Sequence, residues 1–199
     1  MHQFPKDIGW IEVICGSMFS GKTEELIRRI KRAVYAHQKV QVFKPKIDNR
    51  YDELAVVSHS QLKIIATPIE RAEQILQALR ADTEVVGIDE VQFLGADVVP
   101  VCEALAARGV RVVCAGLDQD YQGKPFEPMP QLLAIAEYIS KELAICVVCG
   151  NPANRSQRIA ARAERVVVGA SDAYEARCRK CHSPTPVEAT PPQTLDLFK

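Results

Sequence analysis

The sequence has no excess of charge of either sign. Its 199 residues contain 25 Lys and Arg against 25 Asp and Glu, so the formal net charge is zero. Proteins that hold nucleic acid or anionic lipid through charge alone usually carry a strong basic surplus. We therefore expect neither nucleic acid nor a membrane among the partners of this chain.

Long apolar runs are also absent. No segment approaches the roughly 20 consecutive apolar residues that cross a bilayer, and the initial MHQFPKDIGW has neither the basic stretch nor the apolar core of a signal peptide. These absences lead us to expect a cytoplasmic protein. No internal repeat is visible, and the length allows one substantial domain with a small accessory one.

Seven cysteines are present, an odd number that disfavours a disulfide framework. Three lie in apolar or helical stretches and read as small buried hydrophobic residues: Cys15, Cys102 and Cys114. The others form two Cys-x-x-Cys pairs, which is the ligand set of a tetrahedral structural zinc site: Cys146, Cys149, Cys178 and Cys181.

The two cysteine pairs are separated by 28 residues, more than the roughly 15 to 20 of the common zinc pattern. This spacing indicates a longer ribbon or an inserted loop between them. A redox dithiol and unrelated buried thiols are alternatives to zinc, and His182 is an alternative to Cys181 as the fourth ligand.

Up to about residue 143, segments typical of strands alternate with segments typical of helices. Helix starts and ends are predicted from a capping box of Thr67, Pro68 and Glu70 and from a stop at Gly109. Alternation of this kind builds a parallel α/β sheet covered by helices on both faces, which is the fold class we expect. We predict strands at 10–15, 40–45, 62–66, 84–90 and 110–116, and helices at 24–35, 67–80 and 96–109.

The first predicted helix has one apolar face, made by Leu26, Ile27, Ile30, Ala33 and Val34. Its basic residues lie largely on the other side: Arg28, Arg29, Lys31 and Arg32. We interpret them as a solvated helix surface, and a nucleic-acid face is the alternative.

The segment GSMFSGKT fits the phosphate-binding pattern G-x-x-x-x-G-K-[ST] and lies between a predicted strand and a predicted helix. In this loop, backbone N–H groups and the helix N-terminus surround the phosphates of a nucleotide. Lys22 is expected to pair with the β- and γ-phosphates and Thr23 to bind magnesium. An incidental glycine turn is the alternative. The expected nucleotide-binding residues of the loop are Gly16, Ser17, Met18, Phe19, Ser20, Gly21, Lys22 and Thr23.

A second acidic group for the metal is expected at the end of VVGIDE. Asp89 follows a buried strand, where an aspartate organises the magnesium ion in proteins with this loop. Glu90 is then available as a general base for an attacking hydroxyl or water. A solvated pair of acids at a strand end is the alternative.

The loop alone does not define the acceptor of the phosphoryl group. A GTP switch is disfavoured because no Asn-Lys-x-Asp motif occurs in the chain. A remodelling ATPase usually has a larger partner-binding region, so a small-molecule kinase with a zinc-held lid fits best. We divide the chain into an α/β P-loop domain at 1–143, a zinc-binding unit at 144–182 and a Pro-rich tail at 183–199 that we expect to be extended or disordered.

Five co-linear segments together resemble the type II, or cytosolic, thymidine kinases. They are GSMFSGKT, FKPKIDNRY, IDEVQFL, GLDQDYQGKPFEP and VVVGASDAYEARCRKC with the four cysteines, and the similarity runs from about residue 10 to 182. The resemblance implies a P-loop domain with a zinc-containing domain whose lasso loop covers the nucleoside, assembled as a homotetramer. It also implies transfer of the γ-phosphate of ATP to the 5′-hydroxyl of thymidine with Mg²⁺, a step of pyrimidine salvage inhibited by the end product dTTP.

The resemblance also assigns roles to residues. It makes Glu90 the base for the 5′-hydroxyl and places further nucleotide-binding residues at Asp48, Arg50, Asp89 and Gln92. The residues it implies around the nucleoside are Met18, Phe93, Leu117, Tyr121, Phe126, Ser156, Val167, Gly169 and Tyr174, the last four within or bordering the lasso. Taken singly, each of these residues is more readily explained by core packing.

One position departs from the family pattern. The family usually has proline after the first glycine of the loop, and this chain has Ser17. Serine frees φ and restores an N–H group, so we expect phosphate binding to be kept and the loop to be looser near Met18.

Overall fold

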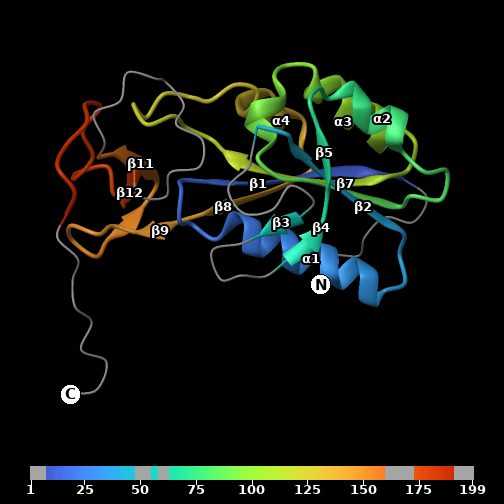
Figure 1. Cartoon of the computed structure of the whole chain (residues 1–199), viewed down its shortest axis with the longest axis horizontal. Helices are drawn as coiled ribbons and strands as arrows, with labels where there is room; N and C mark the ends of the chain where they lie inside the picture. Colours follow the sequence, from blue (N-terminus) through green and yellow to red (C-terminus); the bar gives the residue numbers. More distant parts are fainter. Residues whose placement is uncertain (1–7, 48–54, 58–62, 160–172, 191–199) are drawn as a thin grey trace.

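The computed structural model describes residues 8–47, 55–57, 63–159 and 173–190 (Figure 1). Its centre is a six-stranded sheet in the order β5-β2-β6-β7-β1-β8, and every pairing in this sheet is parallel. The strands are β1 (Trp10–Gly16), β2 (Val40–Pro45), β5 (Thr67–Ile69), β6 (Val85–Ile88), β7 (Arg111–Leu117) and β8 (Tyr138–Glu142). The helices are α1 (Lys22–Tyr35), α2 (Glu73–Ala78), α3 (Val98–Ala107) and α4 (Met129–Ile135), with a 3₁₀ turn η1 (Val91–Leu94).

The side chains of β1 alternate between two hydrophobic cores. Ile11, Val13 and Cys15 belong to the core beneath α2, α3 and α4, whereas Ile14 packs in a second core with the apolar face of α1. Figure 1 shows α1 below the sheet and the other three helices above it. The predicted parallel sheet with helices on both faces is therefore confirmed.

Three two-stranded sheets surround the main one. They are β3 (Ala55–Val57) with β4 (Lys63–Ile65), β9 (Ala144–Ile145) with β10 (Pro152–Ala153), and β11 (Arg155–Arg158) with β12 (Tyr174–Arg177). The last two pairs form the unit that carries the four paired cysteines, here called the cysteine unit (residues 144–182). Within the described residues, none of the helices has the length and apolar character needed to cross a bilayer.

The helix predicted to start at Thr67 is wrong. Thr67–Ile69 is strand β5, which pairs with β2 and buries Ile69, and the helix starts only at Glu73. The side chain of Gln74 accepts the N–H groups of Glu70 and Arg71 at 2.7 and 3.1 Å, so it takes the place expected for a capping box. Pairing beside β2 therefore outweighs the local capping pattern.

Other differences from the predicted elements are smaller. The strand predicted at 62–66 corresponds to β4 (Lys63–Ile65), but it lies outside the main sheet, where it pairs antiparallel with β3. Val34 is 51% exposed and does not join the apolar face of α1. The pattern did not identify β8, which completes the sheet beside β1, nor the short helix α4.

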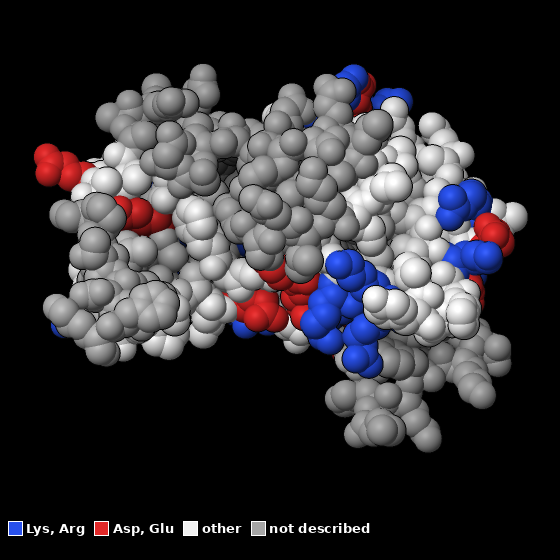
Figure 2. All heavy atoms as spheres, turned by 60° about the horizontal axis from the view of Figure 1, so that its bottom comes forward, with Lys and Arg blue, Asp and Glu red and all other residues white. Residues whose placement is uncertain are grey.

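The basic residues of α1 stand beside acidic ones. Arg28 and Arg29 both pair with Glu25, at 2.5 and 2.8 Å, and Figure 2 shows basic side chains gathered next to acidic ones on this face. Mixed charge of this kind fits the solvated helix surface that we predicted rather than a continuous basic field.

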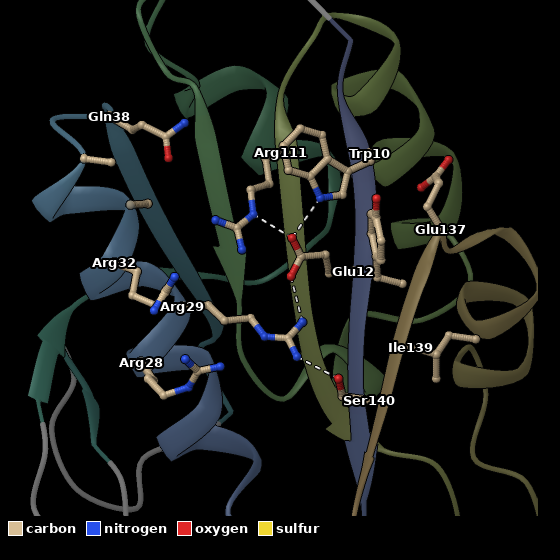
Figure 3. A pocket seen from close by; sticks show the side chains of 13 residues that line it. Trp10, Glu12, Arg28, Arg29, Arg32, Gln38, Arg111, Glu137, Ile139 and Ser140 are labelled. Atoms are coloured by element: carbon tan, nitrogen blue, oxygen red, sulfur yellow. Dashed lines mark hydrogen bonds and ion pairs between the residues drawn. The ribbon is translucent and has the colours of Figure 1, made fainter. Parts of the chain in front are cut away.

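Beyond α1, the face of the sheet at β1 and β8 is left as a hollow of about 970 Å³ (Figure 3). Glu12 lies on its floor and is buried. Its carboxylate accepts hydrogen bonds from Trp10 at 2.8 Å, from Arg111 at 2.6 Å and from Arg29 at 2.7 Å, while Arg29 also donates to Ser140. The carboxylate of Glu12 thus joins β1 to α1 through Arg29 and to β7 through Arg111. Arg29 extends the contact to Ser140 on β8.

Ionised Glu12 should stabilise the fold. Burial disfavours its charge, but the hydrogen bonds and charges of Arg111, Trp10 and Arg29 outweigh burial and lower the pKa of Glu12 below its ordinary 4.5. A lowered pKa adds stability above the unfolded-state value, and this stability is lost as the pH falls through the folded-state value. We expect Glu12→Gln to lose about 3 kcal/mol of unfolding free energy at pH 7, because Arg29 and Arg111, both largely shielded from water, each lose an acidic partner.

The difference between parent and Glu12→Gln should shrink as the pH is lowered below 4.5, which denaturant titrations at several pH values would measure. Glu70→Gln is the matched control, since the ion pair of Glu70 with Lys46 is exposed and its loss should change stability little. Equal stability of parent and Glu12→Gln at pH 7 would contradict the prediction.

Candidate active site and metal centre

The phosphate-binding loop connects β1 to α1 and depends on two glycines. A Cβ atom on Gly16 would lie 2.3 Å from the carbonyl oxygen of Glu142 and 2.8 Å from Oγ of Ser20, so no side chain fits there. Gly21 has φ of +87°, a left-handed conformation that other residues adopt at a cost. The spacing of the two glycines therefore follows from the shape of the loop.

Several polar groups converge inside this loop. Lys22 is buried, and its ammonium donates to the carbonyl oxygen of Ser17 at 2.7 Å. Oγ of Ser20 is buried and has no hydrogen-bond partner among the described residues. The first-turn N–H groups of α1 are free of any side-chain cap, because Gly21 precedes them. An ammonium, a hydroxyl and a helix N-terminus together fit the phosphate groups of a nucleotide.

Thr23 and Asp89 meet across the sheet. Oγ1 of Thr23 lies 3.4 Å from Oδ2 of Asp89. Thr23 lies in the first turn of α1, soon after β1, and Asp89 directly follows β6, and β7 lies between these two strands in the sheet. Asp89 is buried, and its other oxygen accepts the N–H of Glu90 at 3.0 Å. A hydroxyl and a carboxylate are ligands that suit Mg²⁺. These two side chains could hold that ion at the mouth of the loop.

Glu90 has a left-handed backbone conformation, with φ of 47° and ψ of 41°. Such a conformation is costly for a residue with a side chain, and it persists where the surroundings impose it. The side chain of Gln92 supplies one restraint: its Nε2 donates to the carboxylate of Glu90 at 2.5 Å, and its Oε1 accepts the N–H of Leu117. Gly116 makes room, since a Cβ there would lie 2.6 Å from Oε1 of Gln92.

The aromatic residues that the resemblance assigns to the nucleoside lie on η1, on the loop after β7 and on β12. The rings of Phe93 and Phe126 meet edge to face with centroids 6.0 Å apart, and both residues are only partly buried. Tyr121 lies in the loop after β7 and is also partly buried, whereas Tyr174 on β12 is buried. Partly open aromatic rings suit a flat ligand better than a closed core.

The cysteine unit touches the phosphate-binding loop directly. Oγ of Ser156 accepts the N–H of Met18 at 3.0 Å, and the hydroxyl of Ser17 donates to the carbonyl oxygen of Ala153 at 3.4 Å. Ser17 is buried. The hydroxyl of Ser17, which stands where the family usually has proline, therefore joins the loop to β10.

The cysteine unit also contacts the loop between β7 and α4. Arg155 donates to Gln119, and the ring of His182 lies with Nε2 2.8 Å from the carbonyl oxygen of Tyr121. The guanidinium of Arg158 lies 4.5 Å from the centroid of the Tyr121 ring. Sequence reasoning did not identify Arg155 or Arg158, because a run of polar residues such as RSQR is typical of an exposed strand, whereas β11 is buried throughout.

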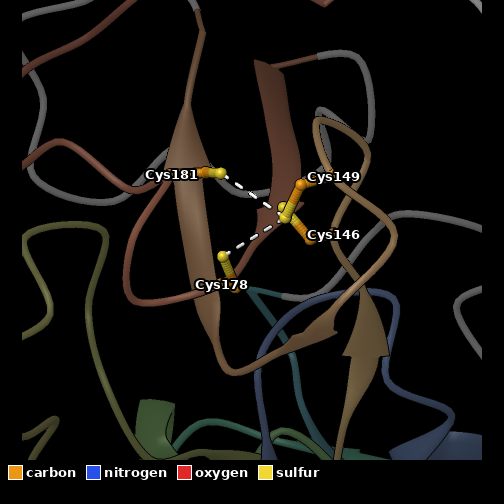
Figure 4. Close-up of side chains that lie close together, drawn as sticks. All are labelled: Cys146, Cys149, Cys178 and Cys181. Carbon is orange, nitrogen blue, oxygen red and sulfur yellow. Dashed lines mark hydrogen bonds between the residues drawn. The ribbon is translucent and has the colours of Figure 1, made fainter.

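The four paired cysteines lie together (Figure 4). Their sulfur atoms are all within 4.8 Å of one another, and this is the one cluster of potential metal ligands that the described part of the chain contains. Asn151 donates to the sulfur of Cys149 at 3.3 Å and lowers the pKa of that thiol to about 6, which favours the thiolate that binds metal. The set fits tetrahedral zinc. The ring nitrogen of His182 is instead directed at Tyr121, so the structure does not support His182 as a ligand.

The remaining cysteines are buried, as predicted. Burial and the negative charge of Asp118 raise the pKa of Cys15 to about 11. Cys102 and Cys114 are fully buried with their sulfur atoms 3.7 Å apart. Buried cysteines of this kind pack as small hydrophobic residues and are chemically inert.

Four of the predicted site residues lie outside the described residues: Asp48, Arg50, Val167 and Gly169. The first part of the tail is described and has no regular element, but it packs on β11 and β12. Gln157 donates to the carbonyl oxygen of Thr185 at 3.0 Å, and the N–H of Val187 donates to that of Arg158 at 3.2 Å.

Comparison with known proteins gives a consistent result. The family model described as thymidine kinase matches residues 9–182. A thymidine kinase of Rhodothermus sp. is 60% identical over 89% of this chain and 83% of its own length, and one of Bdellovibrio bacteriovorus is 58% identical over 88% and 86%. Among solved structures, the ATPase DotB of Legionella pneumophila gives a TM-score of 0.45 at 16% identity, covering 74% of this chain and 44% of that one.

The cysteine cluster predicts a measurable metal content. Purified protein that has not met a chelator should contain about one zinc per chain, since folding around the ion stabilises thiolate ligands. Cys149→Ser should lose zinc and destabilise the cysteine unit. Cys102→Ala is the control, because it removes a buried thiol outside the cluster, and this variant should retain its zinc. Metal analysis and limited proteolysis would measure both. Zinc-free parent protein would overturn the assignment.

Proposed function

The chain belongs to the thymidine kinase family, and we propose that it transfers the γ-phosphate of ATP to the 5′-hydroxyl of thymidine, giving dTMP. The observation that carries this proposal is the position of Glu90. Its buried carboxylate accepts a hydrogen bond from Gln92, and its neighbour Asp89 lies 3.4 Å from the hydroxyl of Thr23. Phe93, whose ring meets that of Phe126, follows Glu90 by three residues. A base beside the proposed magnesium ligands and close in sequence to partly open aromatic rings supports transfer of a phosphoryl group to a flat molecule.

In the proposed reaction, Glu90 accepts the proton of the 5′-hydroxyl. The 5′-oxygen forms a bond to the γ-phosphorus as the bond to the oxygen of ADP breaks, so ADP is the leaving group. The left-handed backbone of Glu90 and its bond from Gln92 support this role, because both hold the carboxylate in one orientation.

The phosphates of ATP are assigned to the loop from Gly16 to Thr23. Lys22 would neutralise the β- and γ-phosphates, while Thr23 and Asp89 would hold Mg²⁺, which would offset the negative charge of the phosphate groups. Asp48 and Arg50 stay assigned near the transferred phosphoryl group because they match family positions.

The nucleoside is assigned to the pocket beside Glu90. Its walls are Met18, Phe93, Leu117, Tyr121, Phe126 and Tyr174, with Ser156, Val167 and Gly169 contributed by the segment that matches the family's lasso loop. The zinc-held unit supports this pocket, since Ser156 and Ala153 bond to the phosphate-binding loop. Holding both substrates out of water disfavours hydrolysis of ATP.

Three further features are proposed from family membership: a cytoplasmic location, inhibition by dTTP, and a homotetramer. One exposed apolar side chain supports the tetramer, since Ile139 on β8 is 53% exposed and lines the hollow in Figure 3. A second copy covering this face would remove it from water.

The reaction is tested by incubating the protein with γ-labelled ATP, Mg²⁺ and a panel of nucleosides. We expect label in thymidine monophosphate and little in inorganic phosphate. Release of phosphate without any nucleoside acceptor would instead indicate an ATPase that uses the zinc-held unit for binding. Glu90→Gln keeps the shape of the side chain, and it should lower kcat about 10²- to 10⁴-fold with ATP binding nearly unchanged.

Asp89→Asn is the matched variant for this test, because it alters the neighbouring carboxylate. It should weaken Mg²⁺-dependent nucleotide binding rather than turnover alone. If Glu90→Gln turned over thymidine within about twofold of the parent, Glu90 would not be the base, and Asp48 would be the next candidate.

Light scattering tests the assembly. We expect a mass near four times the 22.1 kDa of one chain. A monomer at every concentration would remove the tetramer from the proposal and leave the chemistry unaffected.

A further inference from the structure

Arg158 is buried in an unusual way. It is the last residue of β11, it is 1% exposed, and it is the largest of the side chains that are fully buried. A buried guanidinium normally pairs with a carboxylate, because removing an unpaired charge from water is costly. Here Nε and Nη2 are buried and have no hydrogen-bond partner in the described part of the chain.

The groups that lie against the guanidinium are aromatic. Its central carbon is 4.5 Å from the centroid of the Tyr121 ring and 5.8 Å from that of Tyr174. Both distances fall within the range of cation–π attraction. Tyr174 is the direct cross-strand neighbour of Arg158, whereas Tyr121 is far away in sequence, in the loop after β7. Arg158 therefore connects the cysteine unit to the α/β domain through Tyr121, which the proposed function assigns to the nucleoside pocket.

Hydrogen bonds hold the backbone and the hydroxyl of Tyr121, and Arg158 contacts a face of its ring. Within the loop, Asp120 accepts the N–H groups of Gln122 and Lys124, which closes the turn. His182 holds the backbone of Tyr121, and the hydroxyl of Tyr121 accepts from Gln122 at 3.2 Å. These bonds hold the backbone and the tip of the side chain. The contact with a face of the ring comes from Arg158.

We propose that Arg158 is a positioning residue of the nucleoside pocket: its guanidinium covers one face of Tyr121 and so holds the ring as a wall for the pyrimidine. The proposal rests on the proposed function. A buried cation whose Nε and Nη2 have no hydrogen-bond partner among the described residues costs stability, and a residue that costs stability at a binding site is retained for binding. Arg158 should therefore matter more for thymidine than for the fold.

The test compares three variants of the full-length, zinc-loaded protein. Arg158→Met keeps the length of the side chain without the cation, and it should raise KM for thymidine about tenfold, the upper range of a desolvated cation–π contact. Its KM for ATP, its kcat and its zinc content should stay near those of the parent, and its Tm should be equal or higher. Arg158→Lys keeps the charge without the planar face and should give an intermediate KM.

Arg179→Lys is the matched control, because Arg179 is an exposed arginine of the same unit, and it should leave every parameter unchanged. Tyr121→Leu completes a double-mutant cycle. If Arg158 acts through Tyr121, the double variant Arg158→Met with Tyr121→Leu should have no higher KM for thymidine than the single variant with the higher KM.

The outcomes separate the two proposals. A parent that phosphorylates no thymidine overturns both. With an active parent, an unchanged KM in Arg158→Met and Arg158→Lys overturns the positioning role alone, as does additivity in the cycle. Loss of zinc and a lower Tm in both variants would show a structural role instead.

Discussion

Contact between the phosphate-binding loop and the cysteine unit is the constraint on which the candidate site depends. The bonds from Ser17 to Ala153 and from Met18 to Ser156 join a loop made by residues near the N-terminus to strands more than 130 residues later. The unit that these strands form also carries the four clustered cysteines, so the conformation of the loop depends on the fold of the cysteine unit. A metal ion held by those cysteines would stabilise both.

Local patterns predicted the parts of the site that are local. The phosphate-binding loop needs only one strand, two glycines and one helix start, and all of these lie within residues 10–35. Asp89 and Glu90 follow a buried strand, and the cysteine pairs are recognisable by spacing. In each case the residues that supply the chemistry are neighbours in the sequence, so they can be predicted without knowing the tertiary structure.

Features set by long-range packing were not predicted. Thr67 lies in a sound capping pattern, but the space beside β2 favours a strand there. Nothing in the segment RSQR indicates that β11 is buried, because its burial comes from β12, the tail and the loop of Tyr121. The role of Gln92 likewise depends on Leu117, 25 residues away, whose N–H it accepts. Partners of this kind become visible only in the folded chain.

The position of β1 in the sheet has a consequence for synthesis of the protein. β1 is the first strand to leave the ribosome, yet its two neighbours are β7 and β8, which begin at Arg111 and Tyr138. At about 5 to 20 residues per second, this apolar strand waits roughly 5 to 20 s without a partner. During that interval the nascent chain exposes an aggregation-prone apolar segment that a chaperone can protect. The nucleotide loop cannot take its final shape until Glu142 is made, because the carbonyl oxygen of that residue packs against Gly16.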